Sequence, residues 1–238
     1  MNALSNILPI YKRELRSYFN SPIAYVVIVV FLVILGWFFT SNLFLMNIAT
    51  MRVVFELVPL IFLFFVPAVT MRLLAEEKKS GTLELLTTKP VRDIEIVVAK
   101  FLAAWTLLAA ALAPTLIYLV TIMALGRIDI GPVVTGYLGL LLMGGVYIAI
   151  GILASSMTEN QIVAFILSFL MVFVLFILDK VLIYVPEAFA STLEFLAIDY
   201  HFSNIARGVI DSRNIIYFGS LLGFSLFLAT VSLERRKW

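Results

Sequence analysis

The densest cluster of ionisable side chains in this sequence lies between Ala75 and Pro90. Only 13% of all residues are charged, yet this stretch carries Glu76, Glu77, Lys78, Lys79, Glu84 and Lys89. Carboxylates and ammonium groups need water or a partner of opposite charge, so in such an apolar chain they mark a boundary with water. Their chemistry is ion pairing and hydrogen bonding with a partner's side chains. The cluster therefore predicts a contact surface.

The sequence shows no recognisable enzyme active site. It has no cysteine, so a disulfide, a thiolate metal site and a cysteine nucleophile are excluded. His201 is the only histidine, which excludes a histidine zinc site or a histidine triad within one chain. The phosphate-binding pattern G-x-x-x-x-G-K-[ST] and a basic patch with interleaved aromatics are both absent. We expect no catalytic residue, no cofactor, no metal and no nucleic-acid partner.

Long uncharged runs predict that the chain is an all-α membrane protein. The chain is 63% hydrophobic with a mean hydropathy of +1.09, and about 20 apolar residues suffice for a helix to cross a bilayer. A single transmembrane domain over residues 1–238 is predicted, without internal repeats. The expected transmembrane helices are 22–42, 53–72, 97–125, 131–156, 161–184 and 214–234.

Two amphipathic segments flank these helices. Residues 1–20 predict an interfacial helix with apolar residues at helical spacing, and its cations Lys12, Arg13 and Arg16 lie off that stripe, where they can reach the phosphates of membrane lipids. Residues 186–213 predict short helices outside the membrane, before the last span. Pro59, Pro67 and Pro114 either kink their helices or are tolerated there.

The distribution of Lys and Arg predicts the orientation. With both termini in the cytoplasm, five of the 17 cations lie outside, namely Arg52, Arg127, Lys180, Arg207 and Arg213. The other twelve lie inside, as the positive-inside rule requires. The only carboxylates within reach of the spans, Glu56 and Asp179, fall near outer helix ends, so energy for any transport is expected to enter from elsewhere.

The fourth span carries small residues on one helical face, namely Gly144, Gly151 and Ser155. Small residues let two helix backbones approach closely in a membrane. The pattern fits packing between helices of one chain and a dimer seam equally well.

The charged cluster itself predicts a rigid elbow over residues 75–95. Gly81 can interrupt the helix, Thr82 can cap a second short helix, and Pro90 ends it. Leu83, Leu85 and Leu86 would then face the membrane domain and Glu84 would point elsewhere. The alternative is a solvated loop.

The pattern E-E-K-x-x-G-T-x-E-x-L-x-x-x-P, from Glu76 to Pro90, resembles the signature of type-two ABC exporter permeases. Similar stretches extend over the whole chain, among them FLFFVPAVTMRLLAEE at 62–77 and GILASSMTENQIVAF at 151–165, and resemble most the gliding-motility-associated members.

In that family six helices form half of a membrane domain in the bacterial inner membrane, beneath which a separate ATPase subunit binds. The resemblance implies that the ATPase contacts Glu76, Glu77, Lys78, Gly81, Thr82, Glu84 and Pro90, and in a smaller second segment Thr158, Glu159 and Asn160. It also implies a second six-helix permease unit, either identical or a paralogous membrane partner with a periplasmic domain.

The function expected is that of a permease subunit coupling ATP hydrolysis to export or mechanical work. A non-transporting scaffold that anchors partner proteins, and a permease for copper-site maturation, are the alternatives. The transported substrate is not specified by any of these residues.

Overall fold

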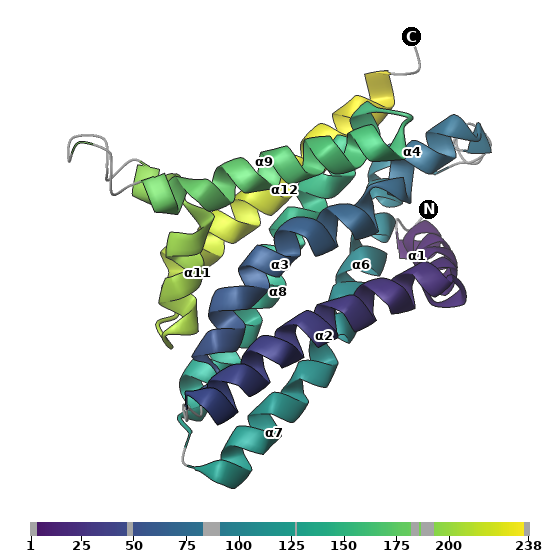
Figure 1. Ribbon diagram of the computed structural model, residues 1–238. Coiled ribbons are helices and arrows are strands. Elements are labelled where there is room, and N and C mark those ends of the chain that lie inside the picture. Colours follow the sequence, from purple (N-terminus) through teal and green to yellow (C-terminus); the bar gives the residue numbers. More distant parts are fainter. Residues whose placement is uncertain are drawn as a thin grey trace.

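The computed structural model describes residues 4–46, 50–82, 91–126, 128–181, 186 and 193–235, and every regular element in them is helical (Figure 1). The elements are α1 Leu4–Asn20, α2 Pro22–Leu45, α3 Arg52–Thr70, α4 Arg72–Lys79, α6 Asp93–Leu112, the 3-10 turn η1 Ala113–Thr115, α7 Leu116–Leu125, α8 Ile130–Met157, α9 Gln161–Val181, α11 Ile198–Ala206 and α12 Ser212–Glu234.

Six helical stretches of the described chain are long and apolar enough to cross a membrane, which confirms the predicted fold class. They are Ala24–Leu45, Arg52–Lys79, Asp93–Leu125, Ile130–Met157, Gln161–Val181 and Ser212–Glu234. The predicted span 53–72 continues directly into α4, and the predicted span 97–125 begins earlier, at Asp93. That earlier start has a local cause, because the carboxylate of Glu95 accepts the N–H of Arg92 at 3.0 Å and caps the helix.

The central helix is α8, which contacts α3, α6, α9, α11 and α12. Buried residues make up 83% of its most apolar window, against 17% for α9 and 22% for α2. A helix that is apolar all round is stable only when other helices or lipid surround it. Helix α8 is therefore the core of the bundle, whereas α2 and α9 present apolar side chains outward.

The three prolines of the predicted spans differ in their effect on the helices. Pro59 and Pro67 lie within α3 without ending it, whereas Pro114 lies in η1, which separates α6 from α7. Neighbouring helices can satisfy the backbone groups that a proline frees, which explains the tolerance in the well-packed α3.

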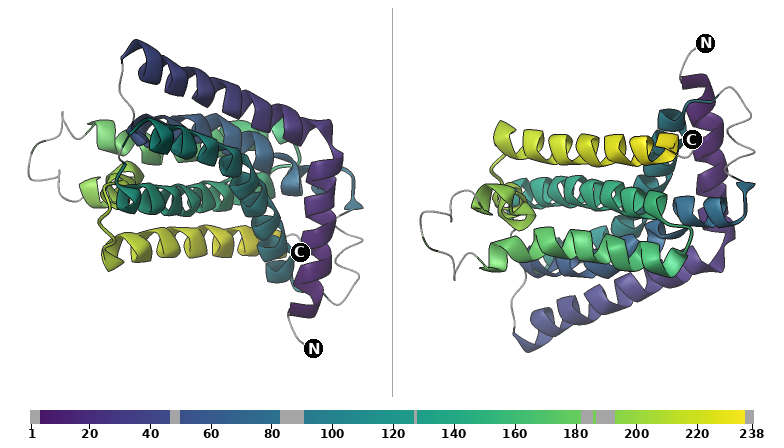
Figure 2. Two further views of the ribbon diagram at one scale, coloured as in Figure 1. Left: turned by 90° about the horizontal axis from the view of Figure 1, so that it is seen from below. Right: turned by 90° about the horizontal axis from the view of Figure 1, so that it is seen from above.

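The bundle has two distinct ends. Helix α1 lies across one end, close to α4, and runs roughly at right angles to the spans (Figure 2). We call this the α4 end. At the opposite α11 end, Phe202 and Ile205 of the predicted outer helices pack beside Gly139 of α8. Val209 is 59% exposed beyond the end of α11.

Candidate functional site: a braced helix at the α4 end

Helix α4 carries the first part of the charged cluster and ends where the sequence predicts an interruption. Gly81 has φ +69°, in the left-handed region that only glycine adopts without strain. The N–H groups of Ser80 and Gly81 bond back to the carbonyls of Glu76 (3.0 Å) and Lys78 (3.1 Å), which closes the last turn. The Thr82 hydroxyl lies 2.9 Å from that of Ser80. Glu84, Pro90 and the predicted second helix of the elbow lie outside the described residues.

The break between α3 and α4 is made by Ser155 of α8. Its hydroxyl accepts the N–H groups of Leu74 (3.1 Å) and Ala75 (3.0 Å) and donates to the carbonyl of Met71 (2.9 Å). A side chain inserted into the ladder of helical hydrogen bonds is a common cause of a kink. The inserted hydroxyl therefore sets the direction in which α4 leaves the spans.

A second contact joins α4 to the end of α8. The Lys78 ammonium group donates to the carbonyl of Ser156, and so does the Ser232 hydroxyl of α12, at 3.2 Å. A cation is well placed on the unpaired carbonyls of a helix C-terminus. The loop between α8 and α9 consists of Thr158, Glu159 and Asn160.

The Asn160 side chain accepts the N–H of Ile162 at 2.9 Å and caps α9. Glu159 is exposed. The structure thus brings the α8–α9 loop next to α4, although the two segments are far apart in the sequence.

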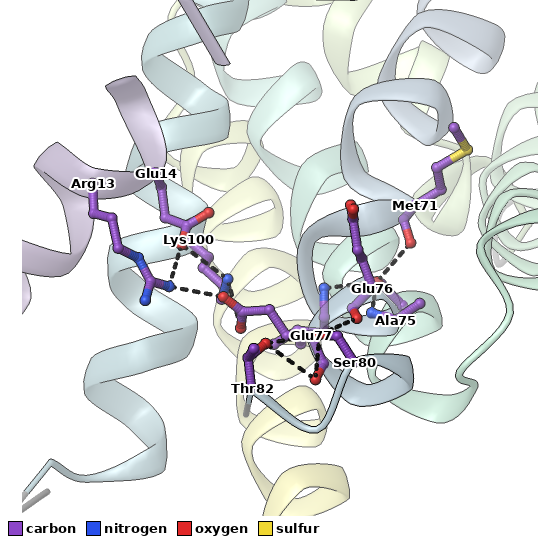
Figure 3. Close-up of polar contacts among 11 residues, drawn as sticks. Arg13, Glu14, Met71, Ala75, Glu76, Glu77, Ser80, Thr82 and Lys100 are labelled. Atoms are coloured by element: carbon purple, nitrogen blue, oxygen red, sulfur yellow. Dashed lines mark hydrogen bonds and ion pairs between the residues drawn. The ribbon is translucent and has the colours of Figure 1, made fainter. Parts of the chain in front are cut away.

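Four charged side chains from three helices meet beside α4 (Figure 3). The Arg13 guanidinium of α1 lies 2.7 Å from both Glu14 Oε1 and Glu77 Oε1, and the fully buried Lys100 Nζ of α6 lies 3.2 Å from Glu14 Oε1 and 3.0 Å from Glu77 Oε2. Neither Lys100 Nζ nor Glu77 Oε2 has a partner with hydrogen-bond geometry, so their contact is an ion pair. Two cations and two anions alternate, and we call this set the charge ring.

The ring determines the protonation of Glu14. Burial would raise the pKa of its carboxyl, but the positive charges of Lys100 and Arg13 outweigh burial and hold the pKa below its ordinary value. The same contacts with Glu14 and Glu77 raise the pKa of Arg13 against the opposing effect of burial. Glu14 and Arg13 are therefore charged at neutral pH.

The ring corrects the expectation for Arg13, which pairs with carboxylates of its own chain and does not lie free for lipid phosphates. Sequence reasoning also missed Glu14, and it treated Lys100 only as one of the inner cations. The available signal was a lysine inside a predicted span, since an ionisable residue there needs a partner.

The predicted ATPase-contact residues divide into two groups. Glu77 and Lys78 are half-buried and bonded within the chain, whereas Glu76, Gly81 and Thr82 are exposed. Glu76 has no ion pair in the described chain. It lies on a cleft of about 430 Å³ between α1 and α4, together with Arg72, Ser80 and Thr82.

The small-residue face of α8 is occupied from within the chain. A Cβ on Gly144 would lie 2.9 Å from both methyl carbons of Leu108, a Cβ on Gly151 would lie 2.7 Å from Thr70 Cβ, and Ser155 holds α4. Both glycines are buried. In this structure the two glycines therefore pack against helices of the same chain.

The described residues contain no group of three or more histidine, aspartate or glutamate side chains that could hold a metal ion. The α4 end presents charged and hydrogen-bonding side chains on a helix that contacts with α1, α6 and α8 hold in place.

Comparison with known proteins agrees with this architecture. A family profile described as ABC-2 family transporter protein matches residues 2–233, nearly the whole chain. No curated protein matches the sequence. The chain, a multi-pass membrane protein with six candidate spans and a braced polar end, therefore belongs to the ABC-2 family of transporter permeases.

Proposed function

We propose that this permease couples ATP hydrolysis on a separate subunit to export or mechanical work across the inner membrane, in a system linked to gliding motility. The α4 end is the cytoplasmic end and receives the ATPase. The observation that carries this proposal is the junction at Ser155 and Ser156, where α4, the last turn of α8 and α12 are hydrogen-bonded together.

This junction suits force transmission. An ATPase that moved the elbow would move α4, and α4 is bonded to α8 through both Ser155 and Lys78. Helix α8 in turn packs against α11 at the far end. Coupling between distant sites needs such a continuous chain of packed elements. These bonds hold the first part of the predicted elbow, up to Lys78, on the core helix of the bundle.

The orientation rests on the charge distribution of the sequence. Placing the α4 end in the cytoplasm puts twelve of the 17 Lys and Arg residues inside.

A second six-helix unit, identical or paralogous, would complete the membrane domain. Helices α2 and α9 are the candidates for that contact, because they expose apolar residues such as Trp37 and Ile166. The family profile supports an ATPase partner in general, and the link to gliding motility rests on the sequence resemblance.

The test is reconstitution of the chain with its ATPase subunit in lipid vesicles. We expect the purified chain alone to hydrolyse no ATP, the complex to hydrolyse it, and hydrolysis to move lipid or solute across the bilayer. Hydrolysis without movement would favour the scaffold. Loss of copper-enzyme activity with intact gliding in a deletion strain would favour copper-site maturation. Hydrolysis by the chain alone would overturn the proposal.

A further inference from the structure

The exposed face of α1 carries two cations without an acidic partner. Lys12 and Arg16 are exposed and form no ion pair within the described residues, in contrast to Arg13 between them, which belongs to the charge ring. Residues four apart on a helix are neighbours, with Cβ atoms about 5–6 Å apart. The two positive groups can therefore act on one ligand.

An apolar hollow adjoins these cations. Lys12, Leu15, Arg16, Phe19 and Asn20 line a hollow of about 350 Å³, and Leu15 and Phe19 are half-buried in it. The Phe19 ring also packs edge-on against Tyr25, at a centroid distance of 6.3 Å. Tyr25 is 53% exposed at the start of the α2 span. The hollow thus leads from two cations to a side chain on the outward face of a membrane helix.

The position of α1 places this hollow at the level of lipid headgroups. The helix lies across the end of the bundle, roughly at right angles to the spans (Figure 2), which is the attitude of an interfacial helix. Its buried face, with Ile10 and Tyr18, packs toward the protein, so the opposite face points away from the protein and is free to contact lipid headgroups.

We infer that Lys12 and Arg16 form a binding site for the phosphate of an anionic phospholipid. Arginine can bind two phosphate oxygens at once, and lysine supplies a compact second charge. Leu15 and Phe19 receive the apolar part of the lipid next to the headgroup. The apolar floor and its continuation toward α2 fit a lipid, because a free phosphate ion gains nothing from either. The site does not depend on the proposed coupling function.

The test compares full-length protein with a double variant, Lys12→Gln with Arg16→Gln. Each protein is reconstituted in mixed phosphatidylethanolamine and phosphatidylglycerol vesicles and extracted in mild detergent, and its bound lipids are identified by native mass spectrometry. The matched control is Arg207→Gln with Arg213→Gln, which removes the same charge from exposed positions at the α11 end. Because all four positions are exposed, unfolding temperatures should be unchanged.

We expect wild type and control to retain phosphatidylglycerol in preference to phosphatidylethanolamine. The Lys12/Arg16 variant should lose about fivefold in affinity for each cation removed. Inorganic phosphate should not displace the lipid. Equal retention of phosphatidylglycerol by the variant and wild type would overturn the inference. Displacement by inorganic phosphate at the same affinity as the lipid would also overturn it, since it would show an ion site.

Discussion

Lys100 of α6 and Glu77 of α4 form an ion pair in which the lysine side chain is completely buried, with 3.0 Å between Nζ and Oε2. This contact pairs Glu77, a carboxylate of the charged cluster between Ala75 and Pro90, with a cation of the protein interior. Glu77 lies on α4, the helix that leads to the elbow. Glu14 gives Lys100 its second anion and Arg13 gives Glu77 its second cation. The four charges form one balanced unit.

Removing one charge from that unit should be costly. We predict that Lys100→Met destabilises the protein by about 3–5 kcal/mol, because two carboxylates would then share one cation in a buried setting. The double variant Lys100→Met with Glu77→Gln leaves the neutral pair Arg13–Glu14 and should recover most of the loss. Thermal unfolding in detergent measures both. A double variant as unstable as the sum of the single changes would contradict the charge ring.

The stability should depend on pH through Glu14. Its pKa is lowered in the folded protein by Lys100 and Arg13. Its contribution to stability is therefore fully present above the ordinary value of about 4.3, and is lost as the pH falls through the lower folded-state pKa. The Glu14→Gln variant should show a flatter loss of stability over that range. Parallel pH profiles for wild type and variant would argue against the assignment.

The close approach of α8 to α3 can be tested at Gly151. An alanine Cβ there would lie 2.7 Å from Thr70 Cβ, so one helix must shift. We expect Gly151→Ala to cost about 1–3 kcal/mol, as overpacking does. Gly223→Ala in α12 is the matched control, because nothing lies within 4 Å of its added Cβ. The unfolding temperatures of the two variants measure this difference. Equal unfolding temperatures would argue against the close packing.

Gly81 follows the end of α4 with a left-handed backbone. Its φ of +69° costs an alanine roughly 1–2 kcal/mol, while no neighbour lies within 4 Å of the added Cβ. Gly81→Ala should therefore redirect the chain after α4 and lower ATPase stimulation in the complex, and Gly81→Pro should do the same. The control Gly219→Ala, in α12 and equally open, should leave stimulation unchanged.

Charge reversal at Glu84 tests the docking proposal directly. Glu84→Lys should leave membrane insertion intact, since the sequence places the residue outside the hydrocarbon, and should weaken ATPase binding. The cost is about 0–1 kcal/mol for an exposed pair and about 2–5 kcal/mol for a pair that becomes desolvated in the contact. Glu194→Lys at the α11 end is the control. If Glu84→Lys and Gly81→Ala both leave assembly and hydrolysis unchanged, the segment is only a solvated loop.

Much of the fold could be predicted from local patterns in the sequence. Hydropathy and run length were enough for the six spans, because crossing hydrocarbon imposes its requirement on each helix separately. The interruption at Gly81 was also readable, since left-handed backbone is a property of the single residue. The amphipathic helix at the N-terminus followed from its spacing.

Only the tertiary structure decided which charges are exposed to solvent and which are paired within the protein. Glu76 and Glu77 are adjacent and chemically identical, yet one is exposed and the other is paired with Arg13 and Lys100. For the same reason the sequence did not show that Gly144 and Gly151 pack against Leu108 and Thr70. A charge is stable inside a protein only beside its counter-charge, and a glycine is close-packed only against a particular neighbour. Both conditions depend on residues from other helices, which no local pattern specifies.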